Sequence, residues 1–82
     1  MQHQNHLTGL ITPISWSSEN QVMQYSLYTN DGEDILLEGR NGLNSRLAKY
    51  NNKLVHLSGF LKRMNQDCRM FNVTHISPIK NA

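Results

Sequence analysis

The stretch YSLYTNDGEDILLEG, residues 25–39, decides the fold of this 82-residue chain. Apolar and polar residues alternate on both sides of the NDG triplet at 30–32, which is typical of strands that bury one face. The Asp-Gly pair supplies the positive φ angles that a tight hairpin turn needs. Together with the alternating residues before it, this stretch predicts a β-hairpin over 22–39. Its expected core-facing residues are Met23, Tyr25, Leu27, Ile35 and Leu37.

Two further segments have strand character, and each contains a glycine. Segment 6–14 carries Gly9 and reaches Pro13, which cannot donate to a sheet ladder and marks an end or an edge. Segment 53–63 carries Gly59. A glycine inside a strand indicates a bulge or a close approach of two backbones. The apolar residues expected to share one face within these segments are Leu7 and Ile11, then Val55, Leu57 and Leu61.

Residues 42–52 change to a helical period. Apolar residues at i, i+4 and i+7 line one face of two or three turns, namely Leu43, Leu47 and Tyr50. Asparagines are expected to cap the helix, Asn41 or Asn44 at its start and Asn51 or Asn52 at its end. A helix this short is not stable alone, so its apolar face must plug another element.

The last segment, 69–79, is again a strand. Its alternation breaks at Ile76, which a bulge near His75 would explain, and Pro78 ends it. The predicted order is β-β-β-α-β-β, an all-β chain with one short helix. Five strands with glycines at bends and a helix after the third predict a five-stranded OB-fold barrel. An SH3-like barrel is the alternative, but it lacks a helix at that point.

The quoted stretch, together with LAKYNNKLVHLSGFLK (47–62) and MFNVTHI (70–76), resembles small bacterial OB-fold domains. Those domains have patterns such as Y-x-L-x-T-x-D-G-x-x-x-L-L-E-G and L-x-x-Y-x-x-K-x-V-x-V-x-G. The resemblance covers residues 7–77. It implies the barrel fold, and a place among envelope proteins or nucleic-acid binders. It implies no catalytic residue, because the matching positions are core, turn and bend residues.

Length and composition bound the remaining possibilities. We expect one domain over 1–82, with frayed polar ends at 1–5 and 80–82. The one cysteine, Cys68, permits no disulfide within the chain, which fits a reducing compartment and a cytoplasmic location. Neither a membrane-spanning run nor a signal peptide is predicted. A periplasmic location stays open, because removal of a signal peptide would leave the same sequence.

Charge is distributed unevenly along the chain. Five acidic residues and no Lys or Arg precede residue 40, whereas eight basic residues and Asp67 follow from Arg40 onward. The two halves therefore carry −5 and +7, which sum to the net +2. Either the folded halves neutralise each other, or the fold presents a one-sided basic surface to an anionic partner.

No residue pattern indicates catalysis, a metal site or a cofactor. The chain has no nucleophile elbow, and the acidic residues near the NDG turn are expected to be solvated rather than tuned for acid–base work. His3 and His6 lie in a polar terminus, while His56 and His75 are expected to be surface or structural residues. Cys68 has no C-x-x-C partner, which argues against zinc. We therefore expect no enzyme activity.

Binding is the function that the predicted fold favours. OB-folds bind across their second and third strands, between the loop joining strands 1 and 2 and the loop joining strands 4 and 5. Aromatic and basic residues fall on these features, and they form the expected site: Trp16, Tyr28, Phe60, Lys62, Arg63 and Arg69. Stacking surfaces beside a basic groove hold single strands with little sequence preference. Three acidic residues near the third strand, Glu33, Asp34 and Glu38, oppose phosphates there.

These features predict a non-enzymatic module that binds single-stranded DNA or RNA weakly. The alternatives are a protein-interaction or assembly module, including a homodimer, and a cell-envelope ligand-binding OB domain. Each site residue also has a purely structural interpretation. Trp16 could cover the barrel end, Tyr28 and Phe60 could meet another subunit, and the basic residues could keep a hairpin soluble.

Overall fold

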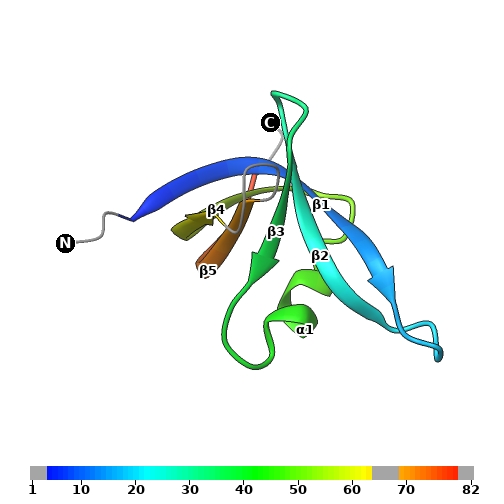
Figure 1. The fold of residues 1–82 in the computed structure, drawn as a ribbon. Helices are drawn as coiled ribbons and strands as arrows, with labels where there is room; N and C mark the ends of the chain where they lie inside the picture. Colours follow the sequence, from blue (N-terminus) through cyan, green and yellow to red (C-terminus); the bar gives the residue numbers. More distant parts are fainter. Residues whose placement is uncertain (1–3, 64–68, 80–82) are drawn as a thin grey trace.

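The computed structural model describes residues 4–63 and 69–79. Five strands and one helix follow in the predicted order: β1 (Asn5–Trp16), β2 (Val22–Thr29), β3 (Asp34–Glu38), α1 (Leu43–Ala48), β4 (Leu54–Arg63) and β5 (Arg69–Pro78). The strands form a closed barrel in the spatial order β1-β2-β3-β5-β4 (Figure 1). All neighbours are antiparallel except β3 and β5, which pair in parallel.

The β2–β3 hairpin turns at the NDG triplet, as predicted, but only Gly32 of the Asp-Gly pair has a positive φ. Gly32 has a φ of 83°, in the left-handed region that favours glycine. Its N–H donates to the Thr29 carbonyl at 3.0 Å, and the Thr29 N–H donates to the Glu33 carbonyl at 2.9 Å. Three positions further along each strand, Ser26 pairs in register with Leu36. The turn therefore fixes which residues of the hairpin face outward.

The barrel interior is filled by apolar side chains from all five strands and the helix. They are Ile11, Tyr25, Leu27, Ile35, Leu37, Leu43, Leu47, Val55, Leu57, Phe71 and Val73, each at most 5% exposed. Except for the two leucines of α1, these residues alternate along their strands with residues that face outward. The positions of the core residues thus determine which residues of each strand face outward.

Two predicted core residues face solvent, so those predictions were wrong. Met23 is 57% exposed and Leu61 is 39% exposed. The β1–β2 register shifts on both sides of Ser15, which removes Met23 from the alternation, and Val22 packs against the core beside it. Leu61 lies beyond Gly59, the last residue of β4 that pairs with β1, so no residue of β1 lies opposite it.

Gly59 lies where two backbones approach closely. A Cβ atom at Gly59 would collide with a backbone carbonyl of β5, and one at Gly9 with a backbone carbonyl of β2. The β4–β5 register shifts between Ser58 and Gly59, and the hydroxyl of the extra residue, Thr74, donates to the Ser58 carbonyl at 3.0 Å. This is the bulge that the broken alternation predicts. It allows Ile76 to pack against the core.

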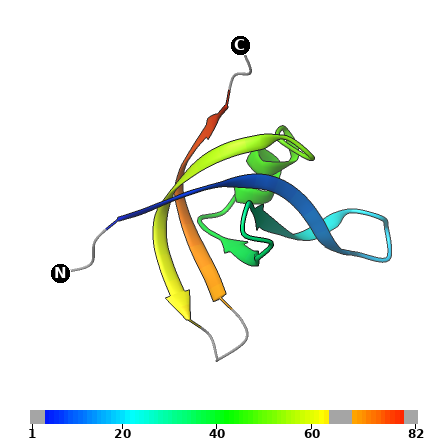
Figure 2. The same ribbon diagram turned by 90° about the horizontal axis from the view of Figure 1, so that it is seen from above.

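The helix plugs the barrel but is shorter than the 42–52 predicted. It spans Leu43–Ala48, with Gly42 at the N-cap position and no side-chain cap, so no asparagine caps its start. Asn52 has a left-handed φ of 60°, but beyond the helix end, and Tyr50 packs against the core from the turn that follows. Figure 1 shows α1 below the strands, and Figure 2 shows it within their outline. Within the described residues, no helix has the length and apolarity needed to cross a membrane.

Candidate nucleic-acid interface

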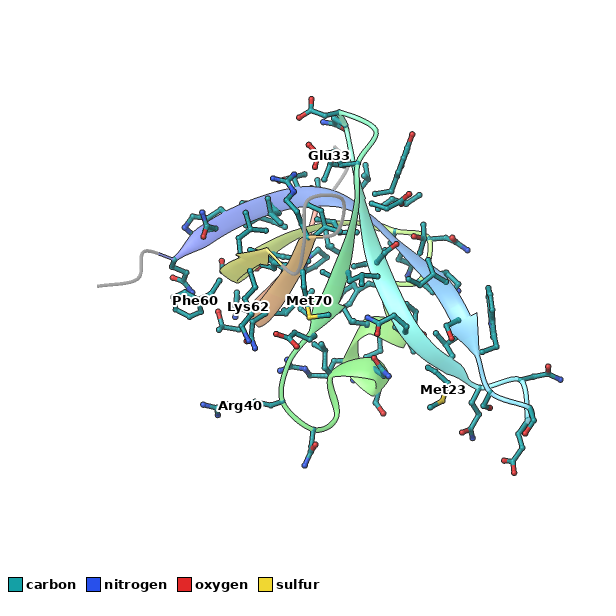
Figure 3. All side chains as sticks on the ribbon, in the orientation of Figure 1. Met23, Glu33, Arg40, Phe60, Lys62 and Met70 are labelled. Atoms are coloured by element: carbon teal, nitrogen blue, oxygen red, sulfur yellow. The ribbon has the colours of Figure 1, made fainter. Side chains whose placement is uncertain are left out.

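A row of paired residues crosses the outside of four strands. Ser26 of β2 pairs with Leu36 of β3, Leu36 with Met70 of β5, and Met70 with Lys62 of β4. Leu36 and Met70 are half-buried, and Lys62 is exposed. Figure 3 labels Met70 and Lys62 beside the ends of β4 and β5. Ser26 is buried, and its hydroxyl oxygen lies 2.9 Å from that of Thr12. This row is the centre of a surface that we call the outer wall.

Tyr28 and Phe60 complete the outer wall, on opposite sides of the row. Tyr28 lies two residues beyond Ser26 on β2 and is 46% exposed. Phe60 lies two residues before Lys62 on β4, is half-buried, and pairs with Asn72 of β5. Three strand spacings separate β2 from β4, roughly 14 Å along the curved sheet. Both aromatic residues face outward, as their parity in the strands predicts.

Two ion pairs connect Lys62 of the outer wall, and Arg69 next to Met70, to the acidic residues near β3. Lys62 Nζ lies 2.9 Å from Glu38 Oε1, and Arg69 Nη2 pairs with Glu33 Oε2. Figure 3 shows Glu33 beside the β2–β3 turn. Exposed pairs of this kind add roughly 0–1 kcal/mol to stability, so their main effect is on surface charge. They neutralise two of the three acidic residues that the sequence sets against phosphate binding.

Trp16 lies apart from the outer wall. It ends β1, is 56% exposed and pairs with Val22, at the turn that extends from the barrel at the right of Figures 1 and 2. Its ring is therefore not packed into the barrel end. Val22 and Tyr28 are six residues apart on β2, which corresponds to roughly 20 Å of strand. The structure thus places one exposed aromatic side chain, Trp16, beside the start of β2 and another, Tyr28, near its end.

Some predicted features fall outside what the structure describes. The backbone of Arg63 ends β4 and pairs in register with Arg69. The predicted loop at 64–68, with Cys68, lies outside the described residues, as does His3. Sequence reasoning missed Leu36, Met70 and Asn72, because the register of β3 with β5 leaves no local pattern in the chain.

Two of the three described histidines, His6 and His56, contact each other and neighbouring hydroxyls, whereas His75 is exposed on β5. The rings of His6 and His56 stack with centroids 5.5 Å apart. His6 Nδ1 lies 3.1 Å from the Ser58 hydroxyl, and His56 Nδ1 lies 3.1 Å from the Thr8 hydroxyl. In residues 4–63 and 69–79, no three His, Cys, Asp or Glu side chains lie close enough together to hold a metal ion.

The fold of this chain is similar to that of a solved SSB-domain structure. A crystal structure of the SSB domain of a Synechococcus sp. protein superposes with a TM-score of 0.62 and 15% sequence identity, and the match covers 94% of each chain. The chain has the OB-fold. An OB-fold barrel has five strands with the helix between the third and the fourth, as observed here. No protein-family model and no curated protein matches the sequence.

Proposed function

We propose that this OB-fold chain is a non-enzymatic module that binds single-stranded DNA or RNA weakly. The observation that carries the proposal is the outward orientation of Tyr28 and Phe60 on the outer wall, with Trp16 exposed at the far end of β2. OB-folds of the SSB type hold single strands by stacking bases on aromatic side chains within a positively charged groove. Each stacked base contributes about 1–3 kcal/mol.

The basic residues of the β4–β5 hairpin have two roles in this proposal. Lys62 and Arg69 neutralise Glu38 and Glu33, and so lower the repulsion that phosphates would meet on the outer wall. Arg63, at the end of β4, supplies a direct phosphate contact. Because these contacts are electrostatic, binding should weaken as salt is added.

The test is a fluorescence titration with a mixed-sequence single-stranded oligonucleotide. Trp16 is the one tryptophan, so its emission reports on the tip of the β1–β2 hairpin alone. We expect quenching at low salt that reverses on adding salt. Tens of micromolar protein lies well inside the range of non-specific affinities. No change in emission, together with no shift of the oligonucleotide on a native gel at that concentration, would contradict the proposal.

An exposed apolar row favours assembly as the second candidate. Leu10 pairs with both Leu54 and Tyr28, so the three lie side by side across β4, β1 and β2. Leu54 is 43% exposed and Tyr28 46%. Apolar surface of this kind fits a protein partner or a second copy of the chain. Assembly predicts a mass in solution above 9.4 kDa that is insensitive to salt and falls when Tyr28 is replaced by Ser.

A further inference from the structure

Three hollows adjoin one another on the side of the barrel where α1 lies near β5. The first, about 370 Å³, lies between the start of β2, the end of β3 and the loop 39–42. The second, about 570 Å³, lies between that loop, α1 and residues 72–74 of β5. The third, about 250 Å³, lies between the end of α1 and His75. Arg40 lines the first two hollows and Arg46 the last two, so neighbouring hollows adjoin, and we call the three together the helix-side trough.

The helix-side trough is lined by three cations. They are Arg40, Arg46 and Lys49, and within the described residues no carboxylate lies within 4 Å of their charged groups. Figure 3 shows Arg40 extending outward from the loop after β3. The one acidic residue that lines the trough in the described part of the chain is Glu38, which is already paired with Lys62. The trough therefore has an excess of positive charge.

The trough is continuous with the outer wall. Asn72 pairs with Phe60 across β4 and β5, and the same Asn72 lines the second hollow together with Arg40 and Arg46. The trough therefore begins one residue across the sheet from Phe60, within reach of a single strand whose base stacks there. Asn41 and Thr74, which also line the second hollow, add neutral hydrogen-bonding groups for phosphate or sugar oxygens.

The charges of the two surfaces differ in sign. On the outer wall, Lys62 and Arg69 face three acidic residues, Glu33, Asp34 and Glu38, which leaves a net charge of −1 without Arg63. The trough has three cations that lack such partners within the described residues. A phosphate binds more favourably to a cation without a carboxylate partner. A cation in an ion pair must first break that pair before it can contact the phosphate.

We infer that the helix-side trough holds the phosphate backbone of the single strand whose bases stack on the outer wall. The inference rests on the proposed function and adds the path of the backbone to it. Arg40, Arg46 and Lys49 contact phosphates in succession, while Tyr28 and Phe60 contact bases. The binding surface thus turns from the strands toward the helix, away from the acidic residues beside the β2–β3 turn.

The test compares two lysines that differ in position but not in chemistry. Lys49 lines the trough, whereas Lys53 lines a separate hollow with Leu10 and Pro78. For single strands, the logarithm of the binding constant falls with the logarithm of salt by about 0.7 per phosphate contact. We expect Lys49→Gln to lower the magnitude of this slope by about 0.7, Arg46→Gln with Lys49→Gln by about 1.4, and Lys53→Gln to leave it unchanged.

The outcomes separate this inference from the proposal beneath it. If the unmodified protein binds the oligonucleotide but Lys49→Gln and Lys53→Gln have the same salt slope, the inference about the trough is overturned. The proposal of nucleic-acid binding then stands. If the unmodified protein binds no oligonucleotide, both fall together. Circular dichroism and urea unfolding of each variant check that its fold is intact. All three positions are exposed, so these variants should fold normally.

Discussion

Tyr28 shows how the position of a residue in a strand decides whether its side chain is exposed to a ligand. Its neighbour Leu27 is completely buried, so the alternation of β2 turns the Tyr28 ring outward. Leu10 lies beside it on β1 and Asp34 on β3. An aromatic ring that is 46% exposed between an aliphatic and an acidic neighbour contributes little to the core. It remains available to a ligand.

Replacing Tyr28 with Ser should weaken oligonucleotide binding by about 1–3 kcal/mol, because it removes one stacking surface. Tyr28→Phe keeps the ring and should bind as the unmodified protein does. The measurement is the dissociation constant from Trp16 fluorescence at low salt. Equal losses in the two variants would show that the hydroxyl matters rather than the ring, which would contradict stacking.

Gly59 is the residue on which the geometry of β4 and β5 depends most. Alanine there places a Cβ against the Asn72 carbonyl, where backbone rather than a flexible side chain must move. We expect Gly59→Ala to lower the free energy of unfolding by about 3 kcal/mol, the upper part of the range for overpacking. Gly32→Ala should lower it by about 1–2 kcal/mol, because it meets a positive φ but no close contact. Urea unfolding measures both, and a smaller loss at 59 than at 32 would contradict the close approach.

At the scale of elements, α1 is defined by what it buries. Six residues are too few for a stable isolated helix, so its stability comes from Leu43 and Leu47 inside the barrel. Leu47→Ala should therefore lower the free energy of unfolding by about 2–5 kcal/mol. Ser45→Ala, on the exposed side, should change it by less than about 0.5 kcal/mol. Similar effects of the two changes in thermal or urea unfolding would contradict the stabilising role of Leu47 inside the barrel.

The pair between β5 and the β2–β3 hairpin gives an element-scale prediction for binding. Arg69→Gln leaves Glu33 without its cation and should weaken oligonucleotide binding by about 1 kcal/mol, the energy of two close charges in water. Adding Glu33→Gln removes the exposed carboxylate and should restore most of that affinity. A double variant as weak as Arg69→Gln alone would mean that Arg69 contacts phosphate directly. Titrations at one low salt concentration decide between the two.

The sequence predicted elements better than it predicted how they meet. The β2–β3 hairpin, helix α1 and the bulge before Ile76 were each predicted from the spacing of residues within one segment, and each is present in the structure. Met23 was misplaced because it has no partner in β1. Ser15 and Trp16 pair with Gln24 and Val22, and this register shift cannot be seen from β2 alone. The trough was missed for a related reason. Arg46 and Lys49 follow one another at helical spacing, but their nearness to β5 depends on the tertiary fold.

For the whole molecule, the net charge of +2 understates what a polyanion would meet. The proposed phosphate contacts are the three trough cations and Arg63, about four in all. The slope of log K against log salt should then be about −3 for a single strand. Titrations at several salt concentrations measure it. A slope near zero together with measurable binding would indicate an apolar mode of recognition, and would contradict phosphate contacts in the trough.

The pairing of β3 with β5 has a consequence for how the chain folds. It joins Leu36 to Met70, positions 34 apart (70 − 36), and β1 joins β4 across a comparable distance, as in Leu10 with Leu54. Barrels that close through such distant pairs have a high contact order and fold in milliseconds to seconds, slowly for their size. During synthesis, the backbone of β3 has no partner on one side until β5 is complete. A chain truncated before Arg69 therefore exposes an open strand edge, which is a template for aggregation.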